Sequence, residues 1–106
     1  MKQYTSKDQT AKLIELGFPK PNPSFYQNRV TWIQCDGYYS IGELIEFLPK
    51  RVGDAQLDFF TGVGKWFVRY EDRHEVPPST VKLWHSRELI HSLFDACVTL
   101  KEEGVI

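Results

Sequence analysis

Apolar and polar residues alternate along the stretch 55–70, apart from a short break at Gly62-Val63. A period of two residues predicts β-strands, and glycine at the first central position is what a type II′ hairpin turn requires. This turn would pair Phe59 with Trp66 and Phe60 with Lys65. The side chains that then share one face are apolar or aromatic: Ala55, Leu57, Phe59, Trp66, Val68 and Tyr70. The other face collects a mixed set: Gln56, Asp58, Phe60, Lys65, Phe67 and Arg69.

The residues near the N-terminus predict a first helix. Ser6 with Gln9, or Thr5 with Asp8, has the spacing of a capping box. Gly17 is placed to end the helix, because glycine readily adopts the left-handed conformation found just after a helix.

The clearest helix start in the chain is at Ser40. Ser40 and Glu43 have the capping-box spacing, and Tyr39 and Leu44 occupy the positions of a hydrophobic staple. Pro49 would end this second helix, since the residue before a proline is disfavoured in the helical conformation.

A third helix is predicted between Ser86, as its cap, and Gly104, as its stop. Its apolar residues recur at helical spacing: Ile90, Leu93, Phe94, Cys97 and Leu100.

Two further stretches read as strands. Residues 25–35 predict one or two strands with Val30, Trp32 and Ile33 as core candidates, followed by a turn at Asp36-Gly37. Residues 80–84 predict a short strand, on which Val81 and Leu83 share one face and Lys82 and Trp84 share the other.

This order of elements predicts an α+β fold. The economical arrangement is a mostly antiparallel sheet of three to five strands with about three helices packed on one face. With 106 residues and no linker or repeat, the chain 1–106 is expected to form a single domain.

Charge and composition exclude several classes. The formal net charge is −1, so no overall field draws the chain to nucleic acid or to anionic lipid. No apolar run approaches the roughly 18 residues of a membrane span, and no apolar segment follows Met1-Lys2 as in a secretory signal. We therefore expect a cytoplasmic protein without membrane contact.

Two segments carry a resemblance to a known family. Residues 39–50, YSIGELIEFLPK, resemble the signature W/Y-S-x-G-x-L-L-x-x-L-P-K, and residues 92–106 resemble L-x-D-A-C…L-x-E-x-G-x-I. The pair of signatures resembles that of a family of small uncharacterised proteins found in gut Bacteroidetes, their prophages and mobile elements. The resemblance implies a bacterial or phage accessory protein, and it implies no activity and no catalytic residues.

The residues themselves predict no enzyme, no cofactor and no metal site. The candidate metal ligands have none of the spacings of a zinc site: Cys35, His74, His85, His91 and Cys97. Adjacent serine and histidine, as at His85-Ser86 and His91-Ser92, says nothing about geometry, and no phosphate-binding or nucleophile motif occurs. A small hydrolase-type enzyme is therefore kept only as the second alternative to the binding functions described next.

The mixed face of the hairpin is the candidate site. If it is uncovered, its aromatic rings and charges form an interaction surface comprising Phe60, Phe67, Lys65, Arg69 and Trp84, with Asp58 and Lys82 also at the rim. The expected function is contact with a protein partner or a second copy of the chain. The first alternative is single-stranded nucleic acid, stacked on the aromatic rings and held by Lys65 and Arg69.

Overall fold

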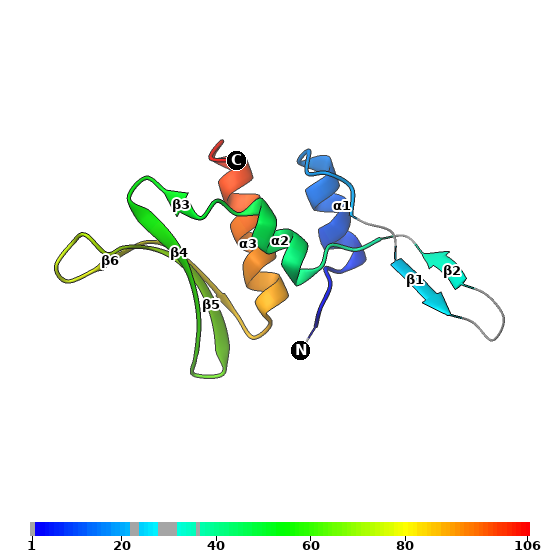
Figure 1. The fold of residues 1–106 in the computed structure, drawn as a ribbon, viewed down its shortest axis with the longest axis horizontal. Helices are drawn as coiled ribbons and strands as arrows, with labels where there is room; N and C mark the ends of the chain where they lie inside the picture. Colours follow the sequence, from blue (N-terminus) through cyan, green and yellow to red (C-terminus); the bar gives the residue numbers. More distant parts are fainter. Residues whose placement is uncertain (1, 22–23, 28–31, 36) are drawn as a thin grey trace.

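A four-stranded antiparallel sheet and three helices make up the fold of this computed structural model (Figure 1). It describes residues 2–21, 24–27, 32–35 and 37–106. The helices are α1 (Lys7–Glu15), α2 (Ile41–Phe47) and α3 (Leu89–Glu102). The sheet has the order β3-β4-β5-β6, with bounds β3 (Arg51–Val52), β4 (Ala55–Gly62), β5 (Lys65–Asp72) and β6 (Ser79–Ser86). The predicted α+β class is confirmed.

A separate two-stranded sheet forms from β1 (Ser24–Gln27) and β2 (Trp32–Cys35). It lies at the opposite end of the molecule from the four-stranded sheet (Figure 1). Of the two readings of residues 25–35, the one with two strands is confirmed. The core candidates Val30, Trp32 and Ile33 and the turn at Asp36 lie outside the residues and side chains that the structure describes.

The helices form a layer on one side of the four-stranded sheet. Helix α3 packs on β5 and β6, and α1 and α2 pack on α3. The centre of this core is fully buried and combines side chains from α1, α2, α3 and β5 with Tyr39, which precedes α2: Leu13, Tyr39, Leu44, Val68, Tyr70, Ile90, Leu93, Cys97 and Leu100. The apolar face of the hairpin therefore meets α3, as its alternation predicts.

Local capping signals set the ends of the helices. Ser6 with Gln9, and Ser40 with Glu43, each form the full reciprocal capping box, which confirms both predicted starts. Leu48 is extended before Pro49, so α2 ends where the proline requires.

Glycine ends the other two helices. Gly17 and Gly104 have φ of 96° and 77°. The amides of Phe18 and Val105 donate back to Leu13 and Leu100, at 3.1 and 2.9 Å. These are Schellman endings, which the positions of the two glycines predict.

The predicted start of the third helix at Ser86 is wrong. Ser86 is the last residue of β6 and pairs with Trp66, so the ladder holds its backbone extended. The N-cap of α3 is Glu88, whose side chain makes no capping hydrogen bond. The helix therefore begins beyond the strand rather than at the better capping residue.

The predicted turn of the central hairpin is also wrong by one position. The turn residues are Val63 and Gly64, with φ of 47° and 73°, and Gly62 pairs with Lys65. Two central residues with positive φ define a type I′ turn rather than type II′. Moving the turn by one residue shifts each cross-strand pair by two positions, so the set of side chains on each face is unchanged.

A cross-strand charge pair favours the observed register. Asp58 lies opposite Arg69, whereas a turn at Gly62-Val63 would place Asp58 opposite Phe67. Each register has one aromatic pair: Phe60 with Phe67 in the structure, and Phe59 with Trp66 in the alternative. Directly opposed aromatic and oppositely charged pairs each stabilise a sheet by about 0.2–1 kcal/mol. The charge pair offsets part of the cost of the left-handed backbone at Val63, which a β-branched residue adopts at about 1–2 kcal/mol.

We expect Val63→Asn to raise the free energy of unfolding by about 1 kcal/mol, because Asn-Gly is the preferred type I′ pair. The Val63 side chain is 91% exposed, so no packing is lost. Urea denaturation of the two proteins measures the change. Val63→Thr keeps the β-branched strain and serves as the control with little gain; an equal gain from threonine would contradict the backbone explanation.

Candidate interaction surface

The face of the sheet turned away from the helices carries Phe60 of β4, Phe67 and Arg69 of β5, and Leu83 and His85 of β6. Ring contacts and ladder pairs join them across the three strands. Among the described residues, no helix or strand packs over this face. Four of the predicted surface residues lie on it together: Phe60, Phe67, Lys65 and Arg69.

The two phenylalanine rings stack on each other. Their centroids are 4.8 Å apart and their planes differ by 3°. The ring of His85 lies 5.7 Å from Phe67 on the far side, and the Arg69 guanidinium lies 4.5 Å from the centroid of Phe60. Both phenylalanines are half-buried by these neighbours and remain outside the main core.

Arg69 is held in place by two carboxylates. Its Nε and Nη2 both donate to Asp58 Oδ2, at 3.1 and 3.0 Å, and Nη2 also donates to Glu71 at 3.1 Å. Arg73 contacts Glu71 at 3.4 Å and adds to the network. Because the groups are only partly buried, we expect each pair to contribute about 0–1 kcal/mol to stability. The network mainly fixes the guanidinium over Phe60 and neutralises its charge.

The prediction that Trp84 belongs to this surface is wrong. Trp84 pairs with Val68 on β5, whose side chain is fully buried beneath α3. Its indole Nε1 donates to Thr99 Oγ1 on α3 at 3.1 Å, and its ring meets Tyr70 edge-on. Lys82 is likewise on the helix side, where it contacts Glu103. Lys82 and Trp84 share one face, as the alternation predicts, but this is the face toward the helices, and a register shift leaves Val81 without a ladder partner on β5.

Val81 and Leu83 take the outward position that was assigned to Trp84. They are 54% and 47% exposed. Leu83 lies opposite Arg69, and the register of β6 shifts between Tyr70 and Glu71, near Val81. Sequence alternation places the two side chains on one face. The pairing of Leu83 with Arg69 shows that this face is the open one, and the exposure of Val81 agrees with it.

No catalytic group is found at the candidate nucleophiles that the structure describes. Cys97 is a buried free thiol, and burial raises the pKa of this thiol to about 12. Its Sγ lies 3.7 Å from the carbonyl of Leu44 and acts as a weak donor. A protonated, buried thiol is not a nucleophile at neutral pH. The side chain of Cys35 is outside the described residues.

The side chains of His91 and Ser92 are used in structural contacts. Ser92 Oγ donates to the carbonyl of Trp66 at 3.0 Å, and His91 Nδ1 is bonded to Gln9 Nε2 at 2.8 Å. The second bond ties α1 to α3. In the described part of the chain, no group of three His, Cys, Asp or Glu residues is arranged to hold a metal ion.

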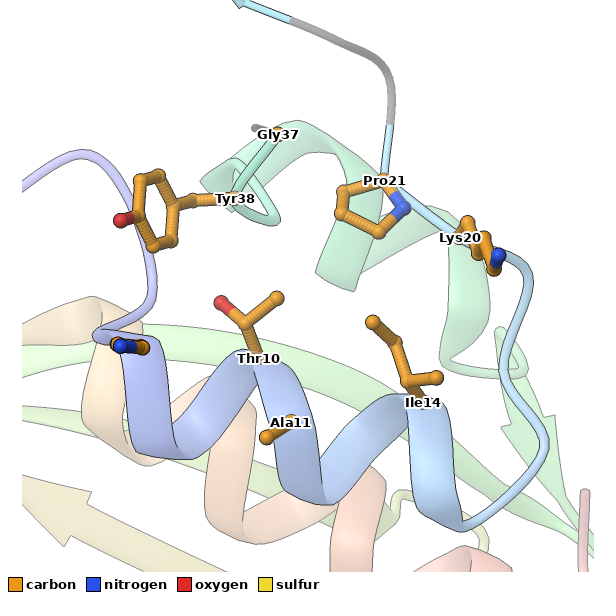
Figure 2. A pocket seen from close by; sticks show the side chains of 8 residues that line it. Thr10, Ala11, Ile14, Lys20, Pro21, Gly37 and Tyr38 are labelled. Atoms are coloured by element: carbon orange, nitrogen blue, oxygen red, sulfur yellow. The ribbon is translucent and has the colours of Figure 1, made fainter. Parts of the chain in front are cut away.

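A shallow hollow of about 370 Å³ lies between α1 and the segments around Pro21 and Tyr38 (Figure 2). Thr10, Ala11 and Ile14 form its floor. The Thr10 hydroxyl is already used, since it donates to the carbonyl of Ser6 at 2.7 Å. Among the described residues the lining includes Lys7, Lys20 and Tyr38 but no carboxylate, histidine or thiol, so no acid–base pair or activated nucleophile is assembled there.

These features define a small α+β domain with one helix-covered sheet face and one uncovered aromatic face. No family model, curated protein or solved structure matches the chain. Of the helices described, none is both long and apolar enough to cross a membrane.

Proposed function

We propose that this chain is a non-enzymatic binding domain that contacts another protein through the outer face of its sheet. The contact surface, here termed the outer patch, consists of Phe60, Phe67, Val81 and Leu83. The observation that carries the proposal is the stacked Phe60–Phe67 pair, which lies beside two exposed aliphatic side chains under no other described element.

The composition of the surface supports a protein as the partner. Apolar and aromatic groups at the centre with charged groups around them are typical of protein interfaces. The rim here is the network of Asp58, Arg69 and Glu71, with Lys65 near the hairpin turn. A protein surface with apolar side chains and mixed charges fits both the centre and the rim.

Single-stranded nucleic acid is less well supported. A base-stacking platform needs free ring faces and cations available to phosphates. Phe60 and Phe67 occupy each other's faces, and Arg69 is paired with two carboxylates.

The bacterial or mobile-element origin is also part of the proposal. It rests only on the two sequence signatures, in residues 39–50 and 92–106.

The test is affinity capture from a lysate of the source organism with wild type, Phe60→Ser/Phe67→Ser and a control, Val76→Ser. We expect the double variant to lose the captured protein and the control to retain it. Val76 is apolar and 97% exposed, and lies in the loop between β5 and β6, so it is not part of the outer patch. Melting temperature is measured alongside, and should stay nearly unchanged in both variants.

Two results would contradict the proposal. Unfolding of the double variant would show that the rings are part of the core. If wild type and the double variant capture the same amount of the partner protein, the contact does not lie on the outer patch. Sedimentation equilibrium of the purified wild type measures whether it is a monomer or a dimer. A dimer in the purified protein would identify the partner as a second copy of the chain, whereas a monomer is expected if the partner is a different protein.

A further inference from the structure

The edge of β4 opposite β5 is only partly covered. Strand β3 pairs with it at two positions, Arg51 with Gln56 and Val52 with Ala55. One further backbone bond joins the amide of Leu57 to the carbonyl of Lys50, at 2.9 Å. Before Lys50, the chain comes from α2 through Pro49 and does not follow β4. The Pro49 carbonyl accepts a hydrogen bond from the Tyr70 hydroxyl at 2.7 Å. No described strand pairs with β4 along this edge beyond Leu57.

The remaining edge presents backbone groups in the pattern that another strand requires. In an antiparallel ladder, alternate residues direct both their N–H and C=O to the same side. Leu57 bonds toward β3, so the backbone groups of Phe59 and Thr61 point to the open side. An edge of this kind is a template for a further strand.

A hollow of about 380 Å³ adjoins this open edge. Ile45 of α2 and Leu57 and Phe59 of β4 form its apolar wall, and Lys50 and Arg51 stand at its margin. The wall side chains are half-buried, so the hollow lies between α2 and the helix-facing side of β4. An inward-pointing side chain of a strand laid beside Phe59 and Thr61 would enter it.

The charge at the hollow indicates the chemistry of the occupant. Lys50 and Arg51 are exposed, and neither forms an ion pair with another described residue. A second copy of the chain is disfavoured, because antiparallel self-pairing of the open edge would bring Lys65 of that copy toward these two cations. Acidic side chains would complement them.

We propose that the open edge of β4 binds an extended segment of another protein by strand addition, with an aliphatic side chain in the hollow and an acidic residue facing Lys50 and Arg51. Main-chain bonds supply affinity in this mode of recognition, and the pocket supplies selectivity. The site is independent of the outer patch, which lies on the opposite face of the sheet.

The experiment is selection of a random nine-residue phage-displayed peptide library on the full chain, followed by fluorescence polarisation with the labelled selected peptide. We expect selected sequences that share an aliphatic position and a nearby Asp or Glu. Lys50→Glu/Arg51→Glu should weaken binding about tenfold by charge reversal. Thr61→Pro removes one outward N–H without removing a bond to β5, and should weaken binding about tenfold, whereas Thr61→Ala should leave it within about twofold.

Hydrogen exchange locates the peptide directly. The amides of Phe59 and Thr61 should exchange rapidly in the free protein and become protected when the peptide is bound. If Thr61→Pro fails to fold, this protection and the charge-reversal variant decide the question.

Several outcomes would overturn the proposal. One is selection that yields no shared sequence, and another is binding that neither variant weakens. Binding lost in Phe60→Ser/Phe67→Ser but kept in Thr61→Pro would place the peptide on the outer patch. A wild-type dimer that Thr61→Pro dissociates would make a second copy the occupant instead.

Discussion

Replacing Tyr70 with alanine is expected to lower the free energy of unfolding by about 3–5 kcal/mol, the range for a large aromatic residue in a core. Tyr70 is fully buried in β5. Its ring meets Trp84 edge-on, with centroids 6.1 Å apart. Its hydroxyl donates to the carbonyl of Pro49. The change therefore leaves a cavity at the centre of the sheet and removes the partner of a carbonyl at the end of α2.

Urea denaturation with a common slope measures the loss. Tyr70→Phe keeps the ring and removes only the hydroxyl, so it should cost about 1 kcal/mol. Tyr4→Ala is the surface control, because Tyr4 is 53% exposed, and it should change stability by no more than about 0.5 kcal/mol. A loss below about 1.5 kcal/mol in Tyr70→Ala would show that the ring does not support the core.

The second large effect is a loss of stability as the pH rises above about 9. Burial raises the pKa of the Cys97 thiol from 9.0 to about 12. Between these values the folded protein keeps a proton that the unfolded chain releases, so stability falls with rising pH. The stability that the buried thiol contributes is complete at pH values below its pKa in the unfolded chain. It is lost as the pH approaches its pKa in the folded protein. At up to about 1.4 kcal/mol per pH unit, this one group costs on the order of 2–3 kcal/mol by pH 11.

Buried tyrosines add to this loss at higher pH. Burial raises the pKa of Tyr70, as does the nearby Cys97, and it also raises the pKa of Tyr39, with a smaller contribution from Glu43. Both phenols ordinarily titrate at 10.0, so their effect begins about one pH unit above that of the thiol.

Unfolding curves between pH 8 and pH 11 test the prediction in a Cys35→Ser background, which removes the other thiol. Cys97→Ala should lower stability at every pH but flatten the decline between pH 9 and pH 10. A decline of the same steepness without Cys97, or no decline in the parent protein, would contradict the assignment of the effect to this thiol.

Comparison of the two hairpin faces shows how far sequence reasoning reaches. Alternation placed Phe59, Trp66 and Val68 together and Phe60 with Phe67, and the structure has both groupings. The turn itself was misplaced, because glycine chemistry favoured Gly62-Val63 whereas cross-strand pairing determined Val63-Gly64. A shift of two positions in pairing leaves the faces unchanged, which is why the candidate surface survived the error.

The sixth strand shows the limit more clearly. Its alternation groups Lys82 with Trp84 as in the structure, yet the sequence analysis assigns Trp84 to the wrong side of the sheet. Nothing within residues 80–84 indicates which set of side chains meets α3; pairing of Trp84 with Val68 decides it. Strand β3, with two residues, is too short to leave a periodic pattern and was not predicted.

The sequence by itself determined the features that depend on neighbouring residues: both capping boxes, the glycine and proline helix ends, and the sorting of side chains within each strand. Their interactions span at most five positions along the chain, so the local order of residues is sufficient. Only the tertiary structure decided the hairpin register, the side of the sheet that α3 covers, and the open edge of β4. Each of these depends on contacts between segments far apart in the chain, where several pairings satisfy the same local pattern and the packing of all the elements together selects one.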